Sequence, residues 1–150
     1  MQKRIKSFPT SRLVKSEDLN HHKTLYAGRS AEWFVESGFV AAASLLNPAN
    51  IICAQIHGMA FKRPVNPGQI VCYTSRIVYA GKSSIYGYVS VSVDDDISNV
   101  QVEGFITFVH VDDENHPQPH GIEIIAETEE EKQLQQRAIQ LKQRLDESRK

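Results

Sequence analysis

The spacing of hydrophobic and polar residues changes from a helical to a strand-like pattern near residue 50. Residues 24–46 are rich in Ala, Leu, Phe and Val, and four apolar positions recur at helical spacing, which are Phe39, Ala42, Ala43 and Leu46. Apolar residues also occupy the other faces of such a helix, which predicts that protein surrounds it. We expect Asn47 and Pro48 to end this helix, and a short strand with a turn to precede it over residues 11–19.

Beyond residue 50 the pattern is typical of strands. Four segments are β-branched or alternate in polarity, and they cover residues 51–61, 69–80, 85–93 and 100–111. The turns between them read "RPVNPG", "GKSS" and "DDDISN", and these short connections predict an antiparallel meander. Because apolar residues fall on both faces of the strands, the long helix is expected to cover one face of the sheet.

The C-terminal part predicts a polar loop and a second helix. Residues 112–121 are polar and contain prolines, and Thr128 with Glu131 forms a capping box at the start of the helix. A narrow apolar stripe follows, made by Leu134, Ala138, Leu141 and Leu145. The stripe is too short for a stable free coiled coil, so it predicts packing on its own domain or on a partner subunit. We therefore expect one domain over residues 1–125, with residues 126–150 as a helix that is not a separate domain.

Composition and charge narrow the function classes. The chain has 150 residues and a net charge of −1, which gives no electrostatic reason to expect nucleic acid or a membrane surface as partner. No apolar run reaches the roughly 18 residues of a membrane span. Cys53 and Cys72 lie in strand-like segments, so reduced core cysteines and a cytoplasmic location are expected. His21 and His22 are adjacent and have no third ligand at suitable spacing, so no metal site is predicted.

Four short motifs, in chain order, resemble the acyl-CoA thioesterases of the hotdog fold. They are "EDLNHHKTLYAG", "GMAFKRPVNPGQIV", "AGKSSIYGYVSV" and "GFITFVHVDDENHPQP". The resemblance covers about residues 8–120. It implies an α+β hotdog fold, in which an antiparallel sheet wraps around a long central helix, here followed by the C-terminal helix. It also implies thioester hydrolysis that needs no cofactor, since coenzyme A is part of the substrate.

The resemblance assigns a catalytic site at the start of the long helix. Free backbone N–H groups at Ala27 and Gly28 would form an oxyanion hole. Asn20 would reach across from a neighbouring subunit and hold the attacking water or the thioester carbonyl. Glu36 would act as base or nucleophile. The register of this acid is open, because the position seven residues after Gly28 holds Val35. Glu36 comes into register only if the preceding turn is one residue longer, and Glu32 is the alternative acid.

The resemblance further places the nucleotide end of coenzyme A near two segments. The candidate contacts are Arg63, Gly81, Lys82, Ser83 and Ser84. The alternative is that residues 81–84 form only a solvated hairpin turn and do not contact coenzyme A. The expected partners are an acyl-CoA substrate and further copies of the chain, as a homodimer or a higher oligomer such as a tetramer or hexamer.

Three functions are weighed against these residues. The first is an acyl-CoA thioesterase, and the alternative is a non-catalytic hotdog protein that binds acyl-CoA or an acyl carrier. Val35 at the expected acid position motivates the alternative. A dehydratase or hydratase is the third, but it usually requires a His and a nearby acid, and the opening of the long helix does not match that arrangement.

Overall fold

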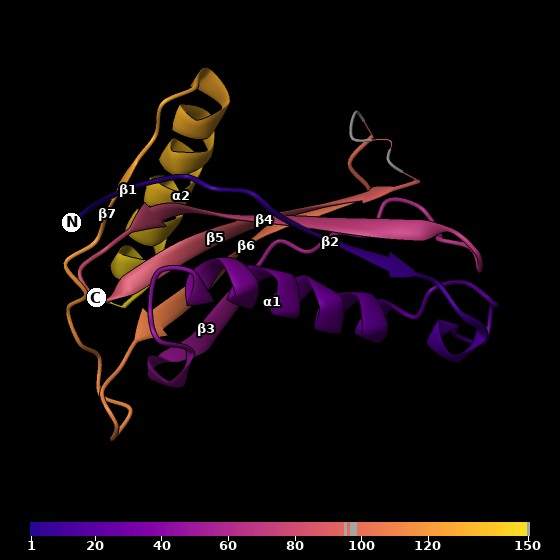
Figure 1. The fold of residues 1–150 in the computed structure, drawn as a ribbon, viewed down its shortest axis with the longest axis horizontal. Helices are drawn as coiled ribbons and strands as arrows, with labels where there is room; N and C mark the ends of the chain where they lie inside the picture. Colours follow the sequence, from indigo (N-terminus) through magenta and orange to yellow (C-terminus); the bar gives the residue numbers. More distant parts are fainter. Residues whose placement is uncertain (95, 97–98, 150) are drawn as a thin grey trace.

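One long helix lies along one face of an antiparallel sheet in the computed structural model, which describes residues 1–94, 96 and 99–149 (Figure 1). The helix, α1, spans Ala27–Ala43. The sheet has five strands in the order β2-β4-β5-β6-β3, and their bounds are Phe8–Leu13 for β2, Ile51–His57 for β3, Ile70–Ala80 for β4, Ser84–Val93 for β5 and Val102–His110 for β6. This confirms the predicted hotdog fold.

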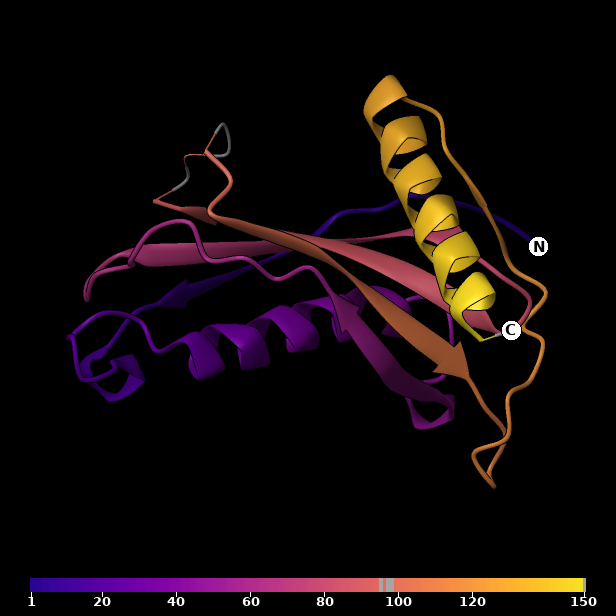
Figure 2. The ribbon, with the colours of Figure 1, turned by 180° about the vertical axis from the view of Figure 1, so that it is seen from behind.

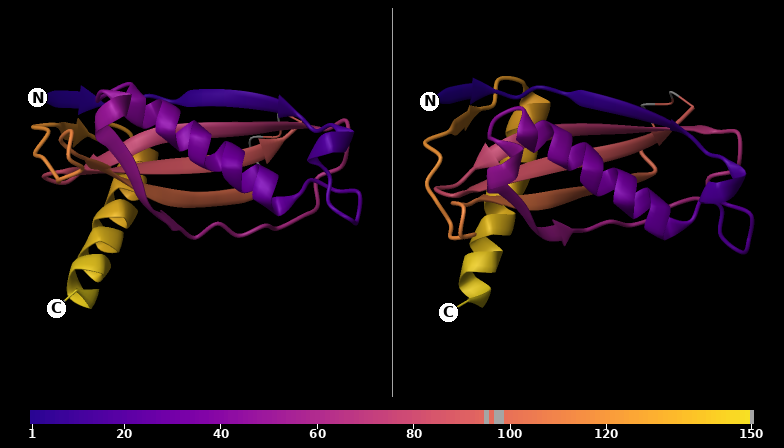
Figure 3. Two further views of the ribbon diagram at one scale, coloured as in Figure 1. Left: turned by 90° about the horizontal axis from the view of Figure 1, so that it is seen from below. Right: turned by 60° about the horizontal axis from the view of Figure 1, so that its bottom comes forward.

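The face of α1 that meets the sheet explains why this segment forms a buried helix. Phe34, Ala41 and Ala42 are 0% exposed, and they recur at the spacing of one helical face. Gly38 lies on the same face, where an added Cβ would come within 2.6 Å of the Ile106 side chain. The close approach of helix and sheet therefore accounts for a glycine in mid-helix. The helix runs obliquely across the strands (Figure 3).

The opposite face of α1 differs from the prediction. Glu32, Glu36 and Val40 are exposed, so protein does not surround the helix within one chain. The physical reason is that a single five-stranded sheet covers only one side of a helix. The helix also ends earlier than expected, at Ala43, and Asn47 instead caps a short 3₁₀ helix, η2 (Pro48–Asn50), by accepting a hydrogen bond from the Ala49 N–H at 3.0 Å.

The strand order corrects the predicted four-stranded meander. Strands β4, β5 and β6 follow one another, but β3 pairs with β6 and forms an edge of the sheet. Residues 58–69 are long enough to carry the chain from β3 to β4 across the end of the sheet, which a tight turn would not allow. The predicted turn over residues 94–99 lies partly outside the described residues.

The second helix, α2 (Glu129–Ser148), packs on the face of the sheet away from α1 (Figure 2). The predicted capping box is present, since the Glu131 N–H donates to Thr128 Oγ1 at 3.1 Å and the Thr128 N–H donates to Glu131 Oε1 at 3.2 Å. Leu134 and Ala138 are buried against the sheet, so the apolar stripe packs on its own domain.

Three short elements complete the fold. A parallel pair, β1 (Gln2–Arg4) with β7 (Glu123–Ile125), was not predicted from the sequence, because each strand is only three residues long. A 3₁₀ turn, η1 (Ser16–Asp18), follows β2 as the predicted turn. No helix among the described residues has the length and apolar character that crossing a membrane requires.

Candidate functional site

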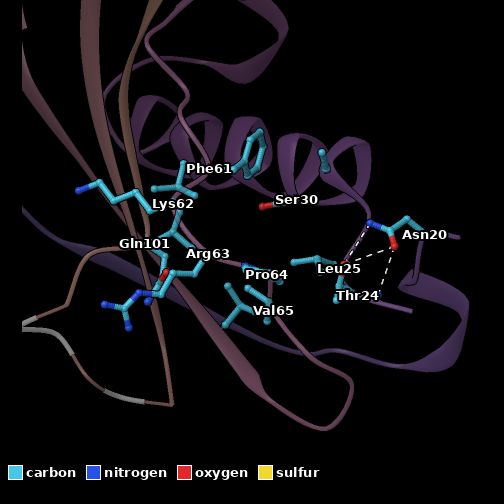
Figure 4. Close-up of a pocket in the computed structure, with 14 residues that line it drawn as sticks. Asn20, Thr24, Leu25, Ser30, Phe61, Lys62, Arg63, Pro64, Val65 and Gln101 are labelled. Carbon is cyan, nitrogen blue, oxygen red and sulfur yellow. Dashed lines mark hydrogen bonds between the residues drawn. The ribbon is translucent and has the colours of Figure 1, made fainter. Parts of the chain in front are cut away.

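A cavity of about 310 Å³ opens between the first turns of α1, the sheet and the connection over residues 58–69 (Figure 4). Its walls are mainly aliphatic, with side chains from Leu25, Val65, Val71, Val91 and Val102. Its polar groups come from Asn20, Thr24, Ser30, Lys62, Arg63 and Gln101. An apolar cavity with a few polar groups is the usual form of a small-molecule site.

The start of α1 leaves two backbone donors unpaired, and the residue of one of them lines this cavity. Tyr26 is the N-cap residue, and its carbonyl accepts from the N–H groups of Arg29 at 3.0 Å and Ser30 at 3.1 Å. The N–H groups of Ala27 and Gly28 have no acceptor among the described residues, and Ala27 lines the cavity. These two donors and the positive end of the helix dipole form a site where negative charge is stabilised.

The Tyr26 ring lies over Gly28. An added Cβ at position 28 would come within 2.5 Å of Tyr26 Cε2, so this ring position requires glycine. Tyr26 is 56% exposed, which leaves the ring free to move away from the helix start. The glycine thus permits close approach to the backbone from the outside, by the ring or by a ligand.

Asn20 holds the loop that precedes the helix. Its Oδ1 accepts from the N–H groups of His22 at 2.9 Å and Thr24 at 3.2 Å, and its Nδ2 donates to Thr24 Oγ1 at 3.2 Å. Lys23 in this loop has a φ of 63°, so the chain turns sharply there. Asn20 is therefore a turn residue in this chain, and it also lines the cavity.

Glu36 lies away from the cavity within one chain. Its Oε2 accepts from Arg12 Nη2 at 3.0 Å, and its side chain is 51% exposed. Helix α1 is continuous from Ala27 to Ala43, so Gly28 and Glu36 lie about two turns apart on one helix. Val35 packs against the core instead, and Glu32 pairs with Arg29 at 3.6 Å on the exposed face.

The two proposed coenzyme A segments lie at opposite ends of the sheet. Arg63 lines the cavity, whereas residues 81–84 form the turn between β4 and β5. Val71 at the start of β4 lines the cavity, and the strand rise places Gly81 about 30 Å from it. The turn lines a separate depression with Lys142 of α2 and with Arg149, which follows the last residue of that helix. One chain therefore groups Asn20, Ala27 and Arg63, but not Glu36 or the turn.

Sequence reasoning missed the two buried polar residues that line the cavity. Ser30 is 4% exposed and its hydroxyl lies 2.9 Å from that of Tyr73, whose pKa is raised to about 12 by burial. Ser30 lies on the same core face of α1 as Phe34, which follows four residues later. This helical spacing could have revealed Ser30 as a buried residue. Gln101 is 8% exposed and stands directly before β6, where no motif marked it.

His57, His110 and His120 have structural partners. His57 Nε2 lies 2.8 Å from Thr107 Oγ1, and burial lowers the pKa of His57. His110 Nδ1 lies 3.0 Å from the Gln118 carbonyl, and His120 Nε2 lies 2.9 Å from the Ser84 carbonyl. Over residues 1–94, 96 and 99–149, no group of three or more His, Cys, Asp or Glu side chains could hold a metal ion.

Comparison with known proteins finds relatives that are similar in sequence and in fold. Residues 22–98 match the thioesterase superfamily. The uncharacterized acyl-CoA thioester hydrolase YkhA of Bacillus subtilis is 28% identical over 141 residues, which cover 92% of this chain and 80% of that protein.

Two solved structures are similar over nearly the whole chain. An acyl-CoA hydrolase from Staphylococcus aureus, in complex with butyryl coenzyme A, coenzyme A and coenzyme A disulfide, superposes with a TM-score of 0.87 at 27% identity, over 99% of this chain and 90% of that one. Further structures of the S. aureus enzyme carry alanine in place of an aspartate, an asparagine or a threonine. An apo-hexameric acyl-CoA thioesterase gives a TM-score of 0.84 at 26% identity, over 95% and 92% of the two chains.

Proposed function

The chain belongs to the thioesterase superfamily, and from that premise we propose that it hydrolyses an acyl-CoA thioester to a free acid and coenzyme A. One observation carries this proposal: Ala27, whose N–H group is unpaired at the start of α1, lines a cavity with aliphatic walls, and the next N–H group, that of Gly28, is also unpaired. Such donors suit a thioester carbonyl, and such walls suit an acyl chain. Similarity to the S. aureus hydrolase supports the same substrate class.

In the proposed reaction, water attacks the thioester carbonyl carbon. The carbonyl oxygen gains negative charge, which the N–H groups of Ala27 and Gly28 and the helix dipole stabilise. The carbon–sulfur bond then breaks, the acid leaves with the oxygen from water, and the coenzyme A sulfur takes up a proton. Asn20, which lines the same cavity, would position the water or the carbonyl with its side-chain amide.

Glu36 is the proposed base that removes the proton from water. The resemblance to the family supports this role, and so does its place about two turns into α1. In one chain its carboxylate pairs with Arg12, so it would have to exchange that partner for the catalytic water. We propose this exchange in the assembled protein, where Glu36 and the Asn20 that lines the cavity would come from neighbouring subunits.

A homo-oligomer is part of the proposal. Edge strand β3 exposes Ile52 at 42% and Ile56 at 41%, and an apolar, unpaired edge favours pairing with another chain. The turn at residues 81–84 lies far from its own cavity, so its contact with coenzyme A would be to a ligand bound at another subunit. The similar apo-hexameric thioesterase supports assembly beyond a dimer.

A non-catalytic acyl-CoA binding protein is the second candidate. Val35, not an acid, packs against the core at the position that the uninterrupted register assigns to the carboxylate. Either function fits a cytoplasmic protein, a location that stays a prediction and that the free thiols of Cys53 and Cys72 support.

Thiol release separates the two candidates. The purified chain is incubated with acyl-CoA thioesters from acetyl to palmitoyl, and binding of the same compounds is measured by calorimetry. The proposal expects turnover above the buffer rate for at least one chain length. Tight binding with no turnover at any length would contradict hydrolysis and support the binding protein.

A further inference from the structure

Asp18 is a buried carboxylate that the proposed reaction does not use. Its side chain is 5% exposed, although it belongs to the short 3₁₀ turn η1. Its Oδ2 accepts from the Lys15 N–H at 2.9 Å, and its Oδ1 lies 3.4 Å from Nε of Arg29. Because a buried charge requires partners, Asp18 and the first turn of α1, which contains Arg29, are held together.

Asp18 contacts the start of α1 on both sides of the two unpaired donors. Its backbone carbonyl accepts from the N–H of the N-cap residue Tyr26 at 2.8 Å, and its carboxylate pairs with Arg29 at the third helical position. Ala27 and Gly28 lie between these two contacts in the sequence. One residue therefore holds the chain before and after both donors.

The usual stabilisation of a helix start would occupy such a donor. A Ser, Thr, Asp or Asn at the N-cap accepts from the N–H of the second or third helical residue, which is Gly28 or Arg29 here. In α1, the N-cap residue Tyr26 makes no side-chain hydrogen bond of this kind, and the first turn holds no acidic residue, whereas α2 has both features. Asp18 instead places a negative charge near the positive end of the helix dipole from outside the helix. The start of α1 is thus stabilised while its donors stay free.

We propose that Asp18 is a positioning residue that holds the N–H groups of Ala27 and Gly28 in place for the thioester carbonyl. This inference rests on the proposed function, in which these donors stabilise the developing oxyanion. Donors that are fixed beforehand need no rearrangement during the reaction, so their orientation acts on kcat more than on KM.

The first test breaks the ion pair through its more exposed partner. The Arg29 side chain is 37% exposed, so Arg29→Gln and Arg29→Lys proteins should fold. We expect kcat for acyl-CoA hydrolysis to fall about tenfold in Arg29→Gln with KM changed by less than about twofold, and to recover in Arg29→Lys, which keeps the charge. Unchanged kcat in Arg29→Gln, or an equal loss in Arg29→Lys, would overturn the inference while leaving hydrolysis itself intact.

The second test changes the buried acid. Arg29 also pairs with Glu32 at 3.6 Å, and Asp18→Asn leaves that pair in place. The same loss in kcat is expected in Asp18→Asn, and unchanged kcat in the folded protein would contradict the inference. Glu130→Gln is the matched control, since Glu130 pairs with Arg76 at 2.7 Å from the first turn of α2, and it should keep both kcat and KM.

Hydrogen exchange tests the position of the helix start without reference to activity. The N–H groups of Arg29 and Ser30, which donate to the Tyr26 carbonyl, should exchange about tenfold faster in Asp18→Asn, with no change in α2. If no acyl-CoA is hydrolysed, the proposed function fails separately, and this exchange decides whether Asp18 holds the helix start. Equal exchange in the two proteins would overturn the inference.

Discussion

Arg12 Nη2 lies 3.0 Å from Glu36 Oε2, and this ion pair holds the acid of α1 on the outward face of the helix. Val35, one residue earlier, is turned by about 100° and packs against the core. The one-residue difference in register that the sequence left open thus corresponds to two different directions in space. The catalytic proposal for Glu36 requires that, in the assembled protein, the thioester is bound next to the outward face of α1.

Replacing Glu36 tests its proposed role. Glu36→Gln keeps the shape of the side chain and removes the base, so kcat should fall by about 100-fold or more. The fold should persist, because an exposed ion pair contributes only about 0–1 kcal/mol to stability. Thiol release and thermal unfolding measure the two effects.

Glu32→Gln is the matched control, since Glu32 is also exposed, also paired with an arginine, and one turn earlier. It should retain kcat within a few-fold. An active Glu36→Gln protein, or a larger loss in Glu32→Gln, would refute the role of Glu36. Greater activity in Val35→Asp would then assign the acid position to residue 35.

The sequence predicted the helix, the capping box and most strands, because each has a strong local signal. Thr128 and Glu131 are three residues apart, and the alternation in β4 shows directly in its residues. The pairing of β3 with β6 is a long-range choice, which local patterns do not encode. The same holds for the cavity, which Ser30 lines from α1 and Gln101 lines from the position directly before β6.

The edge strand β3 gives a prediction about assembly. Ile56→Lys places a charge on the exposed apolar edge and should shift the protein to smaller species, with loss of activity if the site is shared. Light scattering and thiol release measure this. Ile70→Lys is the control, because Ile70 is 45% exposed on β4.

Unchanged assembly in Ile56→Lys would place the interface elsewhere. An unaltered protein that is active as a monomer at working concentration would refute the two-subunit site altogether.

His57 gives a prediction about pH. Burial lowers its pKa in the folded chain, so below its unfolded value of about 6.5 the unfolded state binds more protons. Stability should therefore fall as the pH drops through about 6.5. His57→Gln should show a smaller decrease in the free energy of unfolding between pH 7.5 and pH 5.5, measured by urea denaturation.

His116→Gln is the comparison, because His116 is exposed, with 68% of its side chain accessible. It should keep the pH dependence of the unaltered protein. An identical pH dependence in His57→Gln would show that other groups cause it.

The most direct test of the central claim, that the thioester is cleaved at the start of α1, is the kcat of Ala27→Pro for acyl-CoA hydrolysis. Proline at the first helical position removes one N–H that has no partner within the helix, and Tyr26 has the extended backbone that a following proline requires. Glu129→Pro makes the same change at the first position of α2, with an extended Thr128 before it. We predict that kcat falls by about 100-fold in Ala27→Pro with little change in Tm, while Glu129→Pro keeps full activity. Full activity in a folded Ala27→Pro protein would contradict the account.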